Sequence, residues 1–221
     1  MDDILLQLAS LIERGKIDRD TPYPPDMLGQ DGVSELTQLA ISQNIDAKTI
    51  LNQGLMVGMH NVGEKFSNGE VFITDMLIAA RAMNTALEHL QPFFLSGEIQ
   101  PKGTMILGTV KGDLHDIGKN LVKMIMEGDG WKVIDLGTDV SDDRFIEAVN
   151  QTENAIVGMS ALLTTTMLNM ESVSKSLRAN NQDTKIFIGG APVSQAFSDQ
   201  IGADGYFSNP HGLVRSMREA N

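Results

Sequence analysis

The sequence contains no cysteine, which excludes a disulfide framework, a thiolate metal site and a thiol nucleophile. It also lacks an uninterrupted apolar run of about 18 residues and a signal-peptide pattern, so we expect a cytoplasmic protein that does not enter a membrane. Basic residues are few: 17 lysines and arginines stand against 29 acidic residues, and the net charge is −12. A chain this acidic is a poor partner for a nucleic-acid backbone or an anionic membrane.

Two common nucleotide-binding motifs are absent as well. There is no G-x-G-x-x-G dinucleotide fingerprint and no G-x-x-x-x-G-K-[ST] phosphate loop. The sequence also shows no tandem repeat and no low-complexity tract. Any ligand site in this chain must therefore be built from other residues than those of the usual nucleotide folds.

The chain has 221 residues, of which 42% are hydrophobic, enough for one large domain or two small ones. Residues 1–33 predict an amphipathic helix, with apolar residues at helical spacing from Ile4 to Ile12, and then a proline-rich loop that includes Thr21 to Asp26. We interpret this loop as a surface loop. The alternative is a docking segment for a partner protein.

Residues 34–91 predict a small helical bundle. Ser34, Asp46 and Thr74 each stand where they could cap the N-terminus of a helix. The second and third of these helices carry apolar side chains at intervals of three and four residues, which indicates that their apolar faces pack together. Residues 92–103 begin with a proline and predict a linker.

Residues 104–221 alternate between strand and helix patterns, which predicts a five-stranded parallel sheet covered by helices on both faces, in a flavodoxin-like, Rossmann-like α/β fold. The expected strands are Thr104–Val110, Trp131–Leu136, Ala155–Ser160, Lys185–Gly189 and Gly205–Phe207. The expected helices lie near 117–127, 141–150, 165–179, 193–200 and 211–219.

The stretch Gly108–Asn120 is the strongest candidate for a site. It joins the first strand to the first helix, which places Asp113, His115 and Gly118 in the crevice where parallel α/β sheets bind ligands. An aspartate that accepts a hydrogen bond from histidine Nδ1 fixes the tautomer and directs Nε2 outward, so that Nε2 becomes a better metal ligand or base. Gly118 leaves room for a bulky group to approach the backbone.

Plainer explanations exist for the same residues. An Asp-x-His pair in a loop is often a local hydrogen bond without a ligand. The hydroxyl groups of Thr164, Thr165 and Thr166, which precede a predicted helix, could cap it. Gly189–Gly190 could form a turn after a strand, and Met76 could be an ordinary core residue.

Three elements in this order resemble the signature of B12-binding domains of the methionine synthase and methyltransferase type. They are Asp113-x-His115-x-x-Gly118, Ser160 within Gly158–Thr164, and Gly189–Gly190. The upstream helices resemble the helical cap domain of the same proteins. The resemblance runs from about residue 34 to the C-terminus. It points to the cobalamin-binding corrinoid proteins of microbial methyltransferase systems, and it implies a helical bundle cap followed by the B12-binding α/β domain.

The resemblance also implies roles for single residues. Cobalamin would bind with its own base displaced and with His115 Nε2 as the axial ligand of cobalt, and a hydrogen-bonded relay would run from Thr166 through Asp113 to His115. The other implied cofactor contacts in the α/β domain are Asp116, Ile117, Gly118, Ser160, Leu162, Thr164, Gly189, Gly190 and Ala191. The implied apolar lid over the reactive face consists of Phe66, Ile73 and Met76.

The function that the resemblance implies is that of a methyl carrier, a subunit of a multi-component methyltransferase and not a complete enzyme. One partner would be a methyltransferase that loads the methyl group from a substrate. A second methyltransferase would pass it to tetrahydrofolate or a thiol, and a reductive activating protein would restore the cofactor. The methyl donor that we favour is an aryl methyl ether, as in an O-demethylase system.

Three other functions remain open from the sequence. A B12-dependent regulator would also join a helical cap to this domain, but residues 1–33 are too short, acidic and proline-rich for a DNA-binding helix-turn-helix. The cobalamin subunit of a mutase would share the Asp-x-His-x-x-Gly motif without needing the helical bundle. A flavodoxin-like module that holds a flavin or a phosphate is the third alternative.

Overall fold

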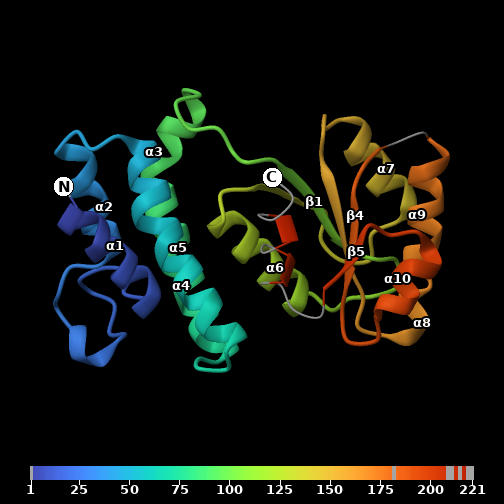
Figure 1. Cartoon of the computed structure of the whole chain (residues 1–221), viewed down its shortest axis with the longest axis horizontal. Helices are drawn as coiled ribbons and strands as arrows, with labels where there is room; N and C mark the ends of the chain where they lie inside the picture. Colours follow the sequence, from blue (N-terminus) through green and yellow to red (C-terminus); the bar gives the residue numbers. More distant parts are fainter. Residues whose placement is uncertain (1, 181–182, 208–211, 214–215, 218–221) are drawn as a thin grey trace. The chain divides into compact units, whose positions relative to one another are not determined.

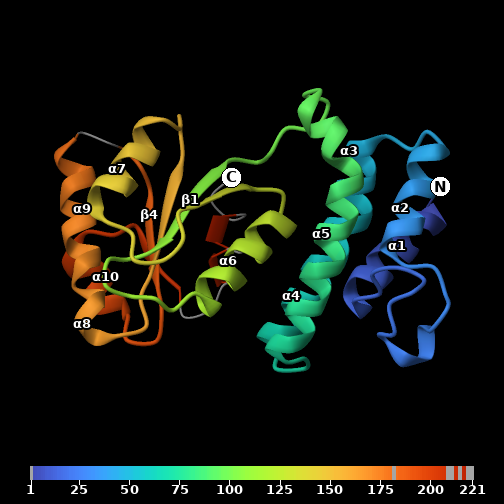
Figure 2. The same ribbon diagram turned by 180° about the vertical axis from the view of Figure 1, so that it is seen from behind.

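The computed structural model describes residues 2–180, 183–207, 212–213 and 216–217. Two compact units make up the chain (Figures 1 and 2). The helical unit consists of Met1–Pro101 with Glu127–Gly130, and the α/β unit consists of Lys102–Met126 with Trp131–Asn221. Within the described residues, none of the helices combines the length and the apolar character that crossing a membrane requires.

The helical unit contains five α-helices and two short helical segments among the described residues. They are α1 (Asp2–Arg14), the 3-10 turn η1 (Pro25–Met27), α2 (Val33–Ser42), α3 (Ala47–Thr49), the π-helical segment η2 (Ile50–Leu55), α4 (Met56–Ser67) and α5 (Ile73–Leu95). α1 packs against η2, α4 and α5, and α2 packs against α5. The predicted bundle is present, and α1 belongs to it.

Close packing of α1 on α4 depends on a glycine. A Cβ atom on Gly58 would lie 2.5 Å from the carbonyl oxygen of Ala9, so only glycine lets the two helices approach this closely. The loop that follows α1 is tied to the bundle by Lys16, which is fully buried and donates a hydrogen bond of 2.8 Å from Nζ to the carbonyl oxygen of Thr21. The proline-rich segment is therefore anchored at its start.

Of the predicted helix caps, Asp46 is confirmed, because its carboxylate accepts a hydrogen bond of 2.8 Å from the Thr49 N–H. The prediction of Ser34 as a cap was wrong. α2 begins one residue earlier with Gly32 as its N-cap, and the Glu35 carboxylate accepts a hydrogen bond of 2.9 Å from the Gly32 N–H. An acidic residue three positions into the helix thus supplies the cap interaction in place of a hydroxyl.

At the start of α5 an acidic side chain again supplies the cap interaction in place of a hydroxyl. The prediction of Thr74 as the cap was therefore wrong. Phe72 is the N-cap, and its N–H donates to the Asp75 carboxylate at 2.8 Å. The predicted helix end before Pro92 was also wrong, since α5 continues through this proline to Leu95. Pro92 lies in the last turn, where its missing N–H removes a single hydrogen bond from a helix that is already ending.

The α/β unit contains a five-stranded sheet in which every pair of neighbouring strands is parallel. The strands are β1 (Thr104–Thr109), β2 (Lys132–Asp135), β3 (Ile156–Ser160), β4 (Ile186–Gly189) and β5 (Gly205–Tyr206), in the spatial order β2-β1-β3-β4-β5. This is the flavodoxin-like order, so the predicted fold class is confirmed. The order reverses between β1 and β3, which is where such sheets bind ligands.

Helices cover both faces of this sheet. They are α6 (Ile117–Gly128), α7 (Asp142–Asn150), α8 (Thr164–Met167), α9 (Asn169–Ala179) and α10 (Gln195–Ile201). Figure 1 shows α7, α9 and α10 on one face and α6 on the other. Helices α7, α9 and α10 bury Phe145, Val173 and Phe197, respectively, against the sheet.

One predicted helix is divided in the structure. Instead of a continuous helix over 165–179, α8 and α9 are separated at Leu168. At this break the Asn169 side chain donates a hydrogen bond of 2.7 Å from Nδ2 to the carbonyl oxygen of Lys111, which holds α9 against the loop after β1. The helix that we predicted near 211–219 lies largely outside the described residues. His211, at the expected start of this helix, also lies outside them.

Candidate functional site

The loop between β1 and α6 carries the central residues of the site. It leaves the sheet at Thr109, whose buried hydroxyl donates a hydrogen bond of 3.0 Å to the carbonyl oxygen of His115. Gly112 adopts the left-handed region with φ of 80°, which turns the chain back toward β3. The turn brings Asp113 beneath the loop that follows β3, at the position where the strand order reverses.

Asp113 is completely buried and accepts hydrogen bonds from both sides of the crevice. Its Oδ1 accepts from His115 Nδ1 at 2.7 Å, and its Oδ2 accepts from Thr166 Oγ1 at 2.6 Å and from the Leu162 N–H at 2.8 Å. Burial by itself would raise the pKa of this carboxyl, but these hydrogen bonds outweigh it and hold the pKa of Asp113 well below its ordinary value. Asp113 is therefore an ionised acceptor at neutral pH.

His115 is oriented by this carboxylate. Its side chain is 51% exposed although its Nδ1 is bound to the buried Asp113. Among the described residues, no hydrogen bond is formed by its Nε2. Because an ionised carboxylate can only accept a hydrogen bond, Nδ1 keeps its proton, and the neutral imidazole presents an unprotonated Nε2 lone pair to the outside, as a metal ligand or base requires.

Thr166 completes a chain of hydrogen bonds from α8 to the imidazole. It is 7% exposed, and its hydroxyl donates to Asp113 instead of capping a helix, since the N-cap of α8 is Leu163. Thr164 is the first residue of α8 and is exposed, so the capping explanation fails for both threonines. Both hydrogen bonds of the Thr166–Asp113–His115 chain that the sequence predicted are present.

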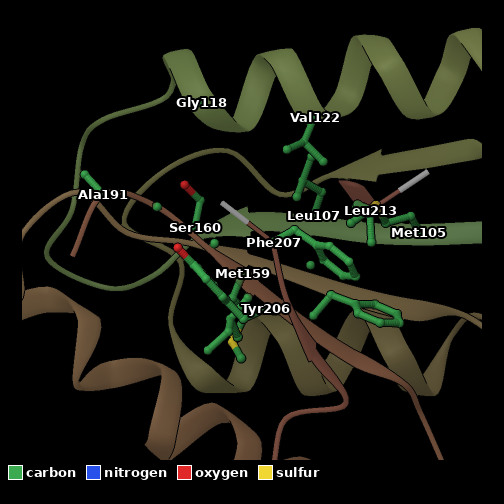
Figure 3. A pocket seen from close by; sticks show the side chains of 15 residues that line it. Met105, Leu107, Gly118, Val122, Met159, Ser160, Ala191, Tyr206, Phe207 and Leu213 are labelled. Atoms are coloured by element: carbon green, nitrogen blue, oxygen red, sulfur yellow. The ribbon is translucent and has the colours of Figure 1, made fainter. Parts of the chain in front are cut away.

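An apolar cavity of about 470 Å³ lies beside this loop, entirely within the α/β unit (Figure 3). It is lined by Met105, Leu107, Gly118, Val122, Gly158, Met159, Ser160, Phe187, Ile188, Gly189, Gly190, Ala191, Tyr206, Phe207 and Leu213. Side chains alternate across a strand, so β1 presents Met105 and Leu107 to the cavity, and β3 contributes Gly158, Met159 and Ser160 to the lining. A Cβ atom on Gly158 would lie 2.2 Å from Cε of Met105, so the β1 side chains pack over this glycine.

Glycines at the cavity serve different purposes. Gly190 has φ of 129°, and a Cβ atom there would lie 1.8 Å from the carbonyl oxygen of Ala161, so the loops after β3 and β4 can cross only with glycine at this position. In contrast, a Cβ on Gly118 would meet no atom within 4 Å. Folding requires Gly190, whereas Gly118 leaves open space at the edge of the cavity.

Exposed apolar side chains surround His115. Leu114 is 73% exposed and Ile117 is 76% exposed, and both flank the imidazole in sequence. Leu162 and Leu163, from the loop after β3, are 45% and 43% exposed. Large apolar groups this exposed mark a surface that a ligand or partner covers. Asp116 has a different role at this edge, accepting hydrogen bonds from Asn120 within the first turn of α6.

Several predicted site residues thus lie together, and others were missed. Gly118, Ser160, Gly189, Gly190 and Ala191 line the cavity, as expected of cofactor contacts. Met105, Leu107, Val122, Phe187 and Tyr206 also line the cavity and were not predicted from the sequence. For the four of these residues that lie on strands, the signal that could have found them is the alternation within each strand, since residues two apart share a face; Val122 lies on α6.

The three residues predicted to form a lid belong to the helical unit. Met76 is 1% exposed, as the plainer explanation of a core residue predicts, whereas Ile73 is 43% exposed and Phe66 is intermediate. The neighbouring Phe72 is 79% exposed and was not predicted. The exposed apolar group at the start of α5 is therefore Phe72 with Ile73.

Comparisons with known proteins agree with this geometry. One family model described as a B12 binding domain matches residues 103–212, and a second with the same description matches residues 28–91. A corrinoid protein of Desulfitobacterium hafniense (strain Y51) is 39% identical over 182 residues, which cover 80% of this chain and 84% of that protein. The trimethylamine corrinoid protein of Methanosarcina barkeri is 38% identical over 190 residues, covering 84% of this chain and 88% of that protein.

Solved structures lead to the same family. The methanol:cobalamin methyltransferase complex MtaBC of Methanosarcina barkeri matches with a TM-score of 0.81 and 28% identity, over 100% of this chain and 81% of the matched chain. A cobalamin-binding protein of Desulfitobacterium hafniense DCB-2 matches with a TM-score of 0.75 and 28% identity, over 97% of both chains. Together with the buried Asp113, the outward imidazole and the cavity, these matches show that the chain belongs to the cobalamin-binding corrinoid proteins of methyltransferase systems.

Proposed function

We propose that this chain holds a corrinoid with its own base displaced, binds cobalt through His115 Nε2, and carries a methyl group between two methyltransferases. The observation that carries the proposal is the pairing of a solvent-facing imidazole with the fully buried, ionised Asp113. A local hydrogen bond in a surface loop would not need a carboxylate with at least four hydrogen-bond donors around it. An imidazole that must bind a metal in one fixed orientation does need such a carboxylate.

The residues of the α/β unit fit a corrinoid in three respects. A single imidazole suffices for a metal that a macrocycle already surrounds with nitrogens, and Nε2 of His115 is directed to receive it. The apolar cavity beside it can take the nucleotide tail, with glycines where a side chain would fill the space. The exposed Leu114, Ile117, Leu162 and Leu163 can lie against an apolar ring face.

When bound, the cobalt would supply the methyl-accepting and methyl-donating chemistry. The chain's own contribution is to set the state of the imidazole. Nε2 of His115 can either ligate the metal or take up a proton, while Nδ1–H stays bound to Asp113. In the protonated state the carboxylate balances the positive charge, and the Thr166 hydroxyl and the Leu162 N–H keep that carboxylate in place. Ligation of the metal and protonation are thus alternatives at Nε2, and the hydrogen bond from Nδ1–H to Asp113 is present in both.

The substitution His115→Ala tests this assignment. In the cob(II)alamin-loaded wild type, the electron paramagnetic resonance lines should be split by one nitrogen nucleus, and in the variant this splitting should disappear while the corrinoid stays bound in the cavity. His60→Ala is the matched control, because this histidine lies on α4 with 41% of its side chain exposed and is not part of the site. Retention of the nitrogen splitting in His115→Ala would overturn the ligand assignment.

We further propose that the helical unit supplies an apolar lid over the reactive face, formed by Phe66, Ile73 and Met76. An apolar cover would keep water and oxidants from the reduced cofactor. Ile73→Ala should therefore speed oxidation of the reduced cofactor in air while its affinity is retained, as followed by visible absorbance. Leu6→Ala, at an exposed apolar position on α1, is the control. An unchanged oxidation rate in Ile73→Ala and Phe66→Ala would contradict the lid.

The proposed partners are a substrate-specific methyltransferase, a second methyltransferase that uses tetrahydrofolate or a thiol, and a reductive activating protein. Relatives are named for trimethylamine and dimethylamine, and one matched structure is a complex with methanol:cobalamin methyltransferase. An aryl methyl ether remains the donor that we propose. Methyl transfer to the reduced, loaded chain should be measured with purified candidate methyltransferases and each of these donors. Transfer only from a methylamine or methanol would reject the ether.

A further inference from the structure

We infer that Asp139, in the turn after β2, is a positioning residue for the His115 imidazole. The inference rests on the proposed role of His115 as a cobalt ligand. Asp139 itself lies outside the cavity lining, and its hydrogen bonds within the described residues do not include one to the imidazole, so it can act only through the loop that carries His115.

Two hydrogen bonds connect Asp139 to that loop. Its side-chain Oδ1 accepts from the Gly112 N–H at 2.7 Å, and its own N–H donates to the carbonyl oxygen of Asp113 at 2.9 Å. The two bonds hold the backbone on either side of the peptide that joins Gly112 to Asp113. The position of this peptide sets the position of the Asp113 side chain. The Asp113 carboxylate in turn orients His115 through the hydrogen bond from Nδ1.

The backbone of the turn is shaped for this purpose. Asp139 has φ of 54°, a left-handed conformation that few residues other than glycine, asparagine and aspartate adopt readily. Gly137, two residues before it, has φ of 86°, and its carbonyl oxygen accepts a hydrogen bond of 3.0 Å from the Thr109 N–H. The Val140 N–H donates to the carbonyl oxygen of Thr109 at 3.0 Å. The turn is thus fixed to the end of β1 on both sides of Asp139.

The second connection from β2 explains why the side chain at 139 matters. Asp135 pairs with the buried Lys119 at 2.7 Å, which fixes the start of α6, the other end of the His115 loop. Between the end of β1 and α6, Gly112 lies in a turn that a hydrogen bond of 3.1 Å from the Asp113 N–H to the carbonyl oxygen of Val110 closes, and the Gly112 N–H inside this turn still requires a partner. The Asp139 carboxylate is that partner.

Three substitutions separate the side-chain hydrogen bond from the backbone conformation. Asp139→Gly keeps the left-handed backbone and removes the acceptor. Asp139→Asn keeps both, because an amide oxygen replaces Oδ1 and asparagine tolerates positive φ. Asp143→Ala is the matched control, since it removes the same charge from an exposed position on α7, four residues away.

The first readout needs no cofactor. In the unloaded protein, amide hydrogen exchange at Gly112 should become faster in Asp139→Gly and remain as in wild type in Asp139→Asn and Asp143→Ala. The second readout uses cob(II)alamin-loaded protein, in which the ratio of histidine-ligated to unligated cobalt is taken from the nitrogen splitting across a pH series. We expect Asp139→Gly to lower this ratio by roughly threefold to tenfold, the effect of losing one hydrogen bond, with Asp139→Asn restoring it.

The outcomes separate this inference from the proposed function. If wild type shows no nitrogen splitting, the assignment of His115 as ligand fails, and the Gly112 exchange rates still decide whether Asp139 holds the loop. If wild type shows the splitting and Asp139→Gly matches it at every pH, the positioning role of Asp139 is overturned. Equal loss in Asp139→Gly and Asp143→Ala would likewise overturn it, because the effect would then be one of net charge.

Discussion

At the level of single residues, two glycines beside the cavity should respond oppositely to the same change. Gly118→Ala places a methyl group in open space on α6, where alanine is a better helix former, so the free energy of unfolding should stay equal or rise by about 0.5–1 kcal/mol. Affinity for hydroxocobalamin should nevertheless fall, since the methyl group occupies room at the cavity edge. Urea unfolding and a spectroscopic binding titration measure the two effects.

Gly190→Ala should instead destabilise the α/β unit by at least about 2 kcal/mol, because the backbone is left-handed and the methyl group would overlap the Ala161 carbonyl. The same unfolding experiment measures it. Equal stability of the two alanine variants would contradict the distinct purposes assigned to these glycines.

At the level of elements, Asp204 joins the end of α9 to β4 and β5. Its carboxylate accepts hydrogen bonds from the Ile186 N–H at 2.8 Å and from Arg178 at 2.7 Å, and it pairs with Lys185 at 3.1 Å. Burial opposes ionisation, but the Ile186 N–H, Arg178 and Lys185 together lower the pKa of Asp204 below its ordinary value. The folded state therefore binds this proton less tightly than the unfolded state.

The sign of the pH dependence follows from this lowered pKa. The stabilisation by Asp204 is complete above the unfolded pKa of about 3.9 and is lost as the pH falls through the lower folded value. Asp204→Asn should reduce the free energy of unfolding by about 1 kcal/mol at pH 7, given the partial exposure of the group. The difference from wild type should shrink below about pH 4.

Urea unfolding at pH 7 and at low pH measures this change, with Asp199→Asn on α10 as the control. A difference between wild type and Asp204→Asn that grew toward low pH would contradict the lowered pKa.

At the level of the whole molecule, the cavity lies in only one of the two compact units. Binding stabilises the state that binds, by about 2.7 kcal/mol when the free ligand is at 100 times its dissociation constant. Cobalamin should therefore raise the unfolding temperature of the α/β unit by roughly 10 °C. Differential scanning calorimetry with and without hydroxocobalamin measures the shift.

Cobinamide, which lacks the nucleotide tail, is the control for this experiment. It should produce a smaller shift because it leaves the apolar cavity unfilled. A cobinamide shift as large as that of cobalamin would exclude the cavity as the tail site.

Much of the architecture could be read from local patterns, while several details could not. Strand positions followed from short apolar runs, and all five predicted strands are present to within a residue or two at each end. The caps at Gly32 and Phe72 were missed because acidic residues at the third helical position reach back to the N-cap N–H, a pattern that competes with a nearby hydroxyl. Asp139 was missed because its partner lies 27 residues earlier.

The sequence alone determined the succession of strands and helices along the chain and the Asp113–His115 pair, since each depends on neighbours a few residues away. Only the tertiary structure decided that the Leu162 N–H meets Asp113, that Phe187 and Tyr206 line the cavity, and that the turn after β2 supports the His115 loop. Those relations depend on which strands become neighbours and which face each one turns to the cavity. Strand order and register arise from packing over the whole α/β unit, and no local pattern encodes them.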